Sequence, residues 1–594
     1  MVAPPLLPRP RKIRLREGRF RTRADTPIVL RQTDEHSVRS AKALGAAIES
    51  ATGRRLPIES HARADGLGRR IELQREGEHG DGYRVRIRTN DIELVGEGPA
   101  GLRYAVETLS QLFRAGRGGS VPTGSIDDAP DLEHRGVLID ISRGKVPTVA
   151  TLRGVLDWMV GMKLNLLMLY TEHTFQFRRH PAIGRGWSPL SAADLLELDA
   201  YAAERHIELV PTLQSLGHMH HLLKMRRYRP LAESPRRWSV SPAVPEVYEL
   251  LDDLYSEYLG NFRSGWFNAN CDEPVDLGRG RSREWAERVG RGAVFRAHLE
   301  RVSALARRYG KKTMFWGDVV HEHPEQIPLL DRDNLLLDWW YEANHDFDRV
   351  RVFRDHSIPF MVCSGTTSWN TLFPRGDNAI ENIAGHARAG KKYGARGLIN
   401  TDWGDNGHYN LLGNSIHALS YGAQASWGTD RVEPGALDRA ISLHVFGDRS
   451  GAIGRLYRRM GGIHATGFDH FNNSPLKTLY FDDVHQGKFY PQVKPTILAR
   501  TLRALERERE RFAAIAPQWA ERPIAREELR FAIDASVLAA EKGLGKKSPR
   551  RLAREQERLM GRHRELWLRR NRPSNFGATE RLYRTSIDSL RRRP

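Results

Sequence analysis

The chain has 594 residues, and this length predicts two to four domains. Hydrophobic residues make up 40% and charged residues 28%, which is ordinary for a protein that buries large cores. The formal net charge of +20 would suit a nucleic-acid partner. However, arginine is spread along the whole chain, and no zinc-finger spacing, RNP-like motif or basic zipper is present. Charge and motifs together argue against a dedicated nucleic-acid function.

Targeting segments and redox motifs are also missing from the sequence. Met1 to Lys12 lacks the apolar core of a signal peptide, and no uninterrupted apolar run reaches transmembrane length. The two cysteines, Cys271 and Cys363, form neither a zinc motif nor a redox motif. We therefore expect a cytoplasmic protein with no membrane partner and no specific nucleic-acid partner. The alternative is a signal peptide that precedes this numbering.

The mixture of strand and helix patterns over residues 1–131 predicts a small α+β accessory domain. Strands are expected at 26–30, 70–73, 83–87 and 92–96, and the last two should pair with each other. Amphipathic helices are expected at 37–52 and from about 99 to 113. The segment Ile126-Asp127-Asp128-Ala129-Pro130 is interpreted as the exit linker of this domain.

From His134 the pattern changes to short apolar strands that alternate with longer helical segments. Eight strands and eight helical segments predict an α/β fold, a (β/α)₈ TIM barrel, over residues 132–430. An open doubly wound sheet is the alternative, but no strand is followed by a Gly-x-Gly-x-x-Gly turn or a Walker A loop. The expected strands are 136–141, 165–170, 207–213, 265–271, 312–316, 335–339, 359–363 and 397–401. The expected helices are 148–162, 191–205, 245–259, 283–309, 325–330, 346–356, 378–393 and one after 412.

Residues 431–594 predict a mainly helical C-terminal region. Apolar positions recur at helical spacing, with Arg and Glu between them, over 502–515, 526–542 and 548–571. No residues there suggest site chemistry. We expect this region to pack against the barrel, where it could close one side of a cleft.

Polar and aromatic residues gather at the carboxyl ends of the predicted barrel strands, which is where barrel sites are built. The most informative pair is Asp272-Glu273, which follows the fourth strand and precedes Pro274. Neighbouring strand residues point to opposite faces, so these two acids can share a site only where the strand breaks into a loop. The other strand-end residues are Asp140, Ser142, Arg143, Tyr170, Glu172, His173, Gln214, Gly217, His218, Trp316, Asp318, Trp339, Trp340, Tyr341, Trp369, Asn370, Asp402, Trp403, Asp405, Asn406 and His408.

Tryptophans clustered beside carboxylates favour a sugar pocket. Aromatic faces pack against the apolar face of a pyranose, while acids and Arg bind its hydroxyl groups. A phosphate ligand would instead call for a Gly-rich anion nest. His218, His220 and His221 are a possible start of a metal site, but the motif His-Glu-x-x-His is absent. We therefore predict no metal and no cofactor.

These residues resemble glycoside hydrolase family 20, the β-N-acetylhexosaminidases. The resemblance rests on Arg135 to Arg143, the Gly217-His218 turn, Asp272-Glu273 and Trp403-Gly404-Asp405. It covers roughly His134 to Asp430, and the preceding α+β segment resembles the accessory domain that often comes before that barrel. It implies an exo-acting hydrolase of terminal β-linked GlcNAc or GalNAc, acting on an oligosaccharide or glycoconjugate.

The resemblance also implies roles for single residues. Hydrolysis would be substrate-assisted, with the 2-acetamido oxygen as the nucleophile. Glu273 would be the general acid and base, and Asp272 would orient the acetamido group. Arg143 and Asp405 would hold the hydroxyl groups of the terminal sugar. The remaining predicted site residues are Trp316, Trp339, Trp369 and Trp403 as pocket walls, with His218 and its expected partner Glu172 behind the acid.

Departures from the family pattern leave some questions open. The Tyr that usually contacts the acetamido oxygen is unassigned, and Tyr341 is the candidate. Asp405 stands where Glu is more usual, which leaves the preference among GlcNAc, GalNAc and modified sugars open. Two alternatives remain. One is a retaining glycosidase with a protein nucleophile, such as Glu172 facing Glu273. The other is a noncatalytic sugar-binding barrel.

Overall fold

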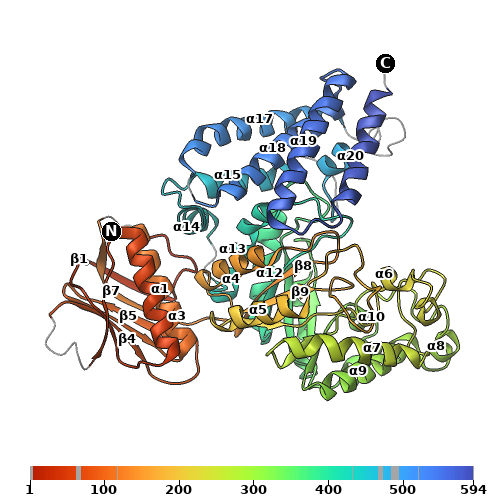
Figure 1. The fold of residues 1–594 in the computed structure, drawn as a ribbon, viewed down its shortest axis with the longest axis horizontal. Helices are drawn as coiled ribbons and strands as arrows, with labels where there is room; N and C mark the ends of the chain where they lie inside the picture. Colours follow the sequence, from red (N-terminus) through yellow and green to blue (C-terminus); the bar gives the residue numbers. More distant parts are fainter. Residues whose placement is uncertain are drawn as a thin grey trace.

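The structure is a computed structural model that describes residues 4–61, 68–116, 118–430, 433–465, 472–482, 494–519 and 521–592. An N-terminal sheet with its helices lies at one end, a barrel occupies the centre, and a set of C-terminal helices lies over one side of the barrel (Figure 1). The predicted segments 1–131 and 431–594 include some residues outside the described ranges, namely 1–3, 62–67 and 117 in the first segment and several short stretches in the second.

The N-terminal segment forms a mixed sheet whose described strands run in the order β1-β7-β5-β6-β4-β2-β3. The helices α1 and α3 contact each other closely, and both contact the sheet (Figure 1). The predicted pairing of the strands at 83–87 and 92–96 is confirmed. The elements are β1 Lys12–Arg21, β2 Ile28–Leu30, α1 Glu35–Thr52, β3 Ile58–Ser60, β4 Arg70–Arg75, β5 Tyr83–Ile87, β6 Asp91–Gly96, α3 Pro99–Ala115 and β7 Ser120–Asp128.

The expected exit linker is wrong for its first three residues. Ile126, Asp127 and Asp128 belong to β7, which pairs antiparallel with both β1 and β5. Ile126 is fully buried, and Asp127 points outward to pair with Arg86 at 2.8 Å. A strand accommodates an acid on its solvent face, such as Asp127, and a buried acid that has partners, such as Asp128 with Tyr83 and Lys163, so the two acids did not signal a loop.

The eight predicted barrel strands are all present as one parallel sheet in the described residues. The order is β10-β9-β8-β15-β14-β13-β12-β11, and hydrogen bonds from Leu213 N to Asn268 O (3.0 Å) and from Asn268 N to Pro211 O (2.9 Å) join the two ends. The strands are β8 His134–Asp140, β9 Leu166–Tyr170, β10 Glu208–Val210, β11 Trp266–Asn268, β12 Lys312–Trp316, β13 Leu335–Trp339, β14 Phe360–Gly365 and β15 Gly397–Asp402.

Most predicted helices of the barrel region are present, but the expected helix at 283–309 is divided in two. Gly290, with φ of 88°, separates α8 from α9, because this left-handed backbone cannot continue a helix. The elements are α4 Val149–Gly161, α5 Ala192–Ala203, α6 His220–Leu223, η1 Arg229–Leu231, α7 Glu246–Tyr258, η2 Leu259–Asn261, α8 Arg283–Val289, α9 Arg291–Arg308, α10 Asp318–Glu322, η3 Pro324–Leu329, η4 Phe347–Val350, α11 Arg351–Asp355, α12 Gly376–Tyr393 and α13 Leu412–Trp427.

The C-terminal helices pack directly on the barrel, where α18 contacts α13. Glu528 of α18 is fully buried, pairs with Arg570 of α19 and accepts a hydrogen bond from the backbone of Gly413 in α13. No helix in the described ranges is long and apolar enough to cross a membrane. The elements are α14 Pro434–Phe446, α15 Ala452–Gly462, η5 Ile463–Ala465, α16 Pro475–Phe481, α17 Pro495–Ile515, η7 Ala516–Gln518, α18 Pro523–Leu544, α19 Pro549–Arg570 and α20 Phe576–Arg591.

The barrel interior is a packed core that changes in character along the strands. Leu138, Met168, Val210 and Met314 are fully buried members of one cluster. At the strand ends this cluster continues into Trp316, Trp369 and Trp403, with Trp339 and Tyr341 packed against it. The aliphatic residues therefore lie beneath a layer of aromatic side chains at the strand ends, and the predicted site lies against that aromatic layer.

Candidate active site

A cavity of about 490 Å³ opens at the carboxyl ends of the barrel strands. Every site residue predicted from the sequence lines this cavity, except Glu172. All of the predicted site residues lie in the described ranges. The lining residues are Ser142, Arg143, Gly144, Trp187, His218, His220, His221, Trp238, Asp272, Glu273, Trp316, Trp339, Tyr341, Trp369, Trp403, Asp405, Asn406, Gly407, Asn472 and Asn575. The volume is that of a pocket for a small ligand, and its wall combines aromatic rings with acids.

The two adjacent acids lie in a loop whose backbone is strained. Strand β11 ends at Asn268, three residues earlier than expected, and Asn270, Cys271 and Glu273 have φ of 61°, 63° and 45°. Non-glycine residues with such φ values are uncommon and cluster at functional sites. The turn brings both Asp272 and Glu273 to the cavity, as the sequence argument required.

Hydrogen bonds from neighbouring segments of the chain hold this loop. Asp318 Oδ2 accepts a hydrogen bond from the Glu273 backbone N–H at 2.8 Å, and Trp238 Nε1 donates to the Glu273 carbonyl at 2.7 Å. Trp316 Nε1 donates to the side chain of Asn270 at 2.9 Å. A Cβ on Gly217 would lie 2.2 Å from the Asp272 carbonyl oxygen, so only glycine permits this close approach.

Asp272 and His218 form a buried ion pair beside the exposed Glu273. His218 Nε2 lies 3.1 Å from Asp272 Oδ2 and 3.4 Å from Glu273 Oε2. Burial opposes the charge on His218, but Asp272 and Glu273 outweigh it and raise the pKa of His218 to about 10. Burial also opposes ionisation of Asp272, yet His218 and a 2.6 Å hydrogen bond from Gln214 keep its pKa below the usual range. Asp272 is therefore a carboxylate at neutral pH, held by His218 and Gln214.

Arg143 is held from several sides. Its guanidinium contacts Asp140 Oδ2 at 3.2 Å, Glu172 Oε1 at 3.1 Å and His218 Nδ1 at 3.1 Å. It also lies over the rings of Tyr170 and Trp403, 4.4 and 5.3 Å from their centroids. Such contacts fix a planar donor group that faces the cavity.

Glu172 lies behind Arg143 and outside the cavity wall, so its position differs from the expected one. Its Oε1 accepts from Tyr170 Oη at 3.0 Å and pairs with Arg143, whereas His218 pairs with the two acids. Arg143 contacts both Glu172 and His218. Burial raises the pKa of Glu172, and the guanidinium of Arg143 opposes that rise.

The aromatic wall is connected by ring contacts and one hydrogen bond. Trp403 Nε1 donates to Tyr341 Oη at 2.7 Å, and the side chain of Thr401 is a second hydrogen-bond partner of this hydroxyl. Tyr341 stacks on Trp339 with centroids 5.1 Å apart and meets the edge of Trp369 at 4.9 Å. Asp405 also lines the cavity; its φ is 43°, and burial raises its pKa to about 6.

Several cavity residues were missed by the sequence argument. Trp187, Trp238, His220 and His221 come from long loops and a short helix after the second and third strands. The other missed residues, Asn472 and Asn575, come from the C-terminal region, for which no site residues were expected. Asn472 accepts a hydrogen bond from Trp369 Nε1, and both asparagines have positive φ. A single asparagine in a turn carries no signal that could have pointed to the pocket.

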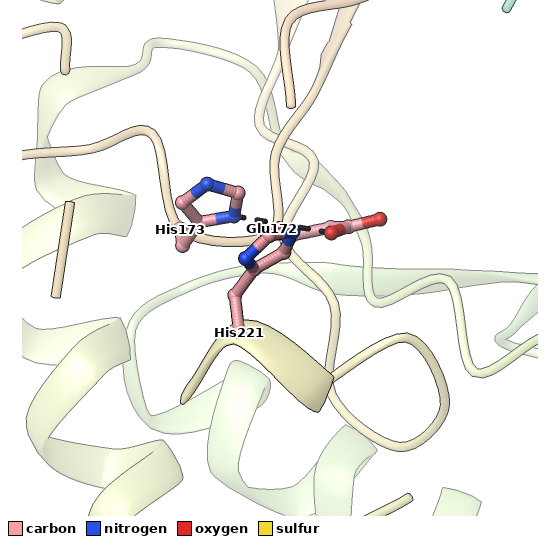
Figure 2. Close-up of side chains that lie close together, drawn as sticks. All are labelled: Glu172, His173 and His221. Carbon is pink, nitrogen blue, oxygen red and sulfur yellow. Dashed lines mark ion pairs between the residues drawn. The ribbon is translucent and has the colours of Figure 1, made fainter. Parts of the chain in front are cut away.

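The histidines near the cavity suggest where a metal could bind. Among the described residues, Glu172, His173 and His221 form the one group of three or more metal-ligand side chains whose ligand atoms lie close together (Figure 2). This group differs from His218, His220 and His221, which the sequence indicated as a possible start of a metal site. Burial lowers the pKa of His173 well below its usual range and that of His221 to about 4.

Comparisons with known proteins agree with this geometry. The family model described as "Glycosyl hydrolase family 20, domain 2" matches residues 3–129, and the one described as "Glycosyl hydrolase family 20, catalytic domain" matches residues 132–367. Hexosaminidase D of Bos taurus is 24% identical over 299 residues, which is 46% of this chain and 84% of that protein. A beta-hexosaminidase of Akkermansia muciniphila is 26% identical over 43% of this chain and 60% of its own length.

Solved structures share the fold. The Streptomyces plicatus N-acetyl-beta-hexosaminidase in complex with Thio-NAglucal superimposes with a TM-score of 0.60 and 19% identity, covering 75% of this chain and 96% of that one. The Flavobacterium johnsoniae chitobiase has a TM-score of 0.63 and 14% identity, covering 99% of both chains. The second similarity extends over the N-terminal sheet, the barrel and the C-terminal helices together.

Proposed function

The chain belongs to glycoside hydrolase family 20, and from this premise we propose that it is an exo-acting β-N-acetylhexosaminidase that uses the 2-acetamido group of its substrate as the nucleophile. It is a glycoside hydrolase with a TIM-barrel catalytic domain. Its substrate would be an oligosaccharide or glycoconjugate that ends in a β-linked N-acetylhexosamine.

The position of Asp272 and Glu273 around one imidazole nitrogen carries this proposal. Both carboxylates lie within 3.4 Å of His218 Nε2, so they approach a bound sugar from the same side. A protein nucleophile has to attack from the side opposite the leaving group. The pair therefore suits a division of roles. Glu273 would be the acid, and Asp272 would position the substrate's own acetamido group.

Glu172 is poorly placed to act as a protein nucleophile. It does not line the cavity, and its Oε1 is engaged by Arg143 and Tyr170. Arg143 lies between Glu172 and the space for the sugar, so a covalent bond between the sugar and Glu172 would require Arg143 to move. This contact pattern supports the substrate-assisted reaction over the retaining alternative with a protein nucleophile.

Each proposed role follows from the surroundings of the residue. Glu273 is the acid in contact with solvent, with 47% of its side chain exposed, so it can protonate the leaving oxygen and then accept a proton from water. Asp272 is anionic and buried, which suits it to hold the acetamido N–H and to stabilise the positive oxazolinium ion. Tyr341 lines the cavity near this acid, and its hydroxyl is the proposed donor to the acetamido oxygen.

Binding of the terminal sugar is assigned to the far side of the cavity. Arg143 and Asp405 would bind its outer hydroxyl groups, and Trp316, Trp339 and Trp403 would enclose its ring. A cavity that ends in such contacts admits the nonreducing end of a chain, which makes the enzyme exo-acting.

A panel of nitrophenyl β-glycosides tests the proposal. The N-acetylglucosaminide and N-acetylgalactosaminide should be hydrolysed, whereas the glucoside and galactoside, which lack the acetamido group, should not. A thiazoline that mimics the oxazoline should inhibit competitively. Equal turnover with and without the acetamido group would contradict the proposal, and no turnover of any glycoside would favour a noncatalytic sugar-binding barrel.

A further inference from the structure

A compact group of ligand side chains lies beside the sugar pocket, and the proposed hydrolysis assigns no chemical step to it. Glu172 and His173 follow strand β9, and His221 is in the short helix α6. One ligand atom from each residue lies within 4.8 Å of the other two. In Figure 2 the two imidazoles and the carboxylate converge from two separate chain segments.

Three buried polar atoms of this group lack hydrogen-bond partners. His173 is 1% exposed and Glu172 is 5% exposed. Both ring nitrogens of His173 and the Oε2 of Glu172 are buried without a hydrogen-bond partner. Burying such atoms unpaired is unfavourable, so a native structure normally satisfies them with a ligand, an ion or water. The closest approach between them, 3.9 Å from His173 Nδ1 to Glu172 Oε2, is too long for a hydrogen bond.

The donor set selects a class of ion. Two imidazole nitrogens and one carboxylate oxygen suit Zn²⁺ and related first-row transition metals, whereas Mg²⁺ and Ca²⁺ prefer oxygen ligands only. His221 is partly exposed and lines the sugar cavity, so an ion could enter from there. The ring of Trp187 packs against both imidazoles, at 4.3 Å from His173 and 4.7 Å from His221, and limits their rotation.

We propose that Glu172, His173 and His221 bind one divalent transition-metal ion of the zinc class at the edge of the sugar pocket, and that this ion inhibits the enzyme. The inhibition would act through Glu172. Its Oε1 pairs with Arg143, and its Oε2 is the oxygen available to the metal. A cation on Oε2 would draw negative charge away from Arg143 and would bring a second positive charge close to the guanidinium. Arg143 would then bind the sugar less tightly, and the KM for the substrate would rise.

Equilibrium dialysis of the chelator-treated full chain against zinc chloride tests the binding directly. Wild type should bind one equivalent tightly, and His221→Ala and His173→Ala should each weaken that binding by tenfold or more. His221→Ala is the more informative variant because its side chain is partly exposed and its loss leaves no buried void. The matched control is His36→Ala, which removes an exposed histidine from another imidazole pair, with His206 at a centroid distance of 5.2 Å.

The control should bind zinc as wild type does. Absence of a bound equivalent in wild type, or equal affinity in wild type and His221→Ala, would overturn the metal site. If His36→Ala weakened binding as much as His221→Ala, the bound zinc would lie elsewhere and the site would likewise be refuted.

The inhibition rests on the proposed function and is tested separately with a nitrophenyl N-acetylglucosaminide. Saturating zinc should raise the KM of wild type and of His36→Ala, and should leave the KM of His221→Ala unchanged. An equal rise in His221→Ala would show that zinc acts on Asp272 or Glu273 instead. Absence of turnover in the metal-free enzyme would refute the proposed function, while the dialysis result would still decide the metal site.

Discussion

Replacing Asp318 by Asn should change how stability depends on pH. Burial and the nearby charge of Asp272 raise the pKa of Asp318 to about 8. Its Oδ2 accepts from the backbone N–H of Glu273, and its Oδ1 is buried without a hydrogen-bond partner. At neutral pH the carboxyl is therefore protonated in the folded state and ionised in the unfolded state. An asparagine can keep the acceptor for Glu273 and removes the titration.

The sign and size of the effect follow from linkage. A carboxyl whose folded pKa is raised stabilises the fold fully below its unfolded pKa, near 4, and this contribution is lost as pH rises towards 8. The loss is about 1.4 kcal/mol per pH unit, which gives an upper bound of about 4 kcal/mol between pH 5 and pH 8. Above pH 8 the carboxyl is ionised in both states, and the contribution stays constant.

Urea unfolding followed by tryptophan fluorescence measures the effect. Comparing Asp318→Asn with wild type at each pH removes the contributions of groups that do not interact with Asp318. The free energy of unfolding of the variant should rise relative to wild type from pH 5 to pH 8 and then level off. A difference that is constant across this range, or that falls with pH, would refute the assignment of a raised pKa to Asp318.

Three further predictions concern the proposed hydrolysis. Glu273→Gln should lower kcat by roughly 10²–10⁴-fold on a poor leaving group and by less on nitrophenyl substrates; an equal loss on both would remove Glu273 from the acid role. Asp272→Asn should lower kcat by on the order of 10²–10³-fold while product binding survives, as calorimetry with GlcNAc can show; a matching loss of binding would contradict the electrostatic role. Arg143→Lys keeps the charge but loses the planar fork, so it should weaken GlcNAc binding by about 10- to 100-fold; unchanged affinity would exclude the clamp.

The barrel could be predicted because its strands are buried on both faces. Segments such as Leu335–Trp339 are apolar almost throughout, and each ends in polar or aromatic residues. The pairing of Asp272 with Glu273 in one site also followed from the sequence, since two neighbours can share a site only in a loop. The structure places the other predicted residues in the same cavity, apart from Glu172.

Other features have no local signal. Strand β1 is exposed along most of its length, and its apolar alternation is short, with only Ile13 and Leu15 before the register shift, so its pairing with β7 is what defines it. Asn472 and Asn575 reach the cavity because the C-terminal helices dock on the barrel, a long-range event that spacing along the chain does not encode. The grouping of Glu172 with His221 likewise depends on how two separate loops meet.

Fluorination of the substrate's N-acetyl methyl group tests the central claim most directly. If the acetamido oxygen is the nucleophile, each added fluorine makes it a poorer one, and kcat/KM of wild type should fall progressively from the acetyl to the trifluoroacetyl substrate. The hydrolysis of these substrates can be followed with one nitrophenyl leaving group, so the step assisted by Glu273 stays the same. A kcat/KM that does not change along the series, together with a sugar trapped covalently on a protein carboxylate, would contradict the account.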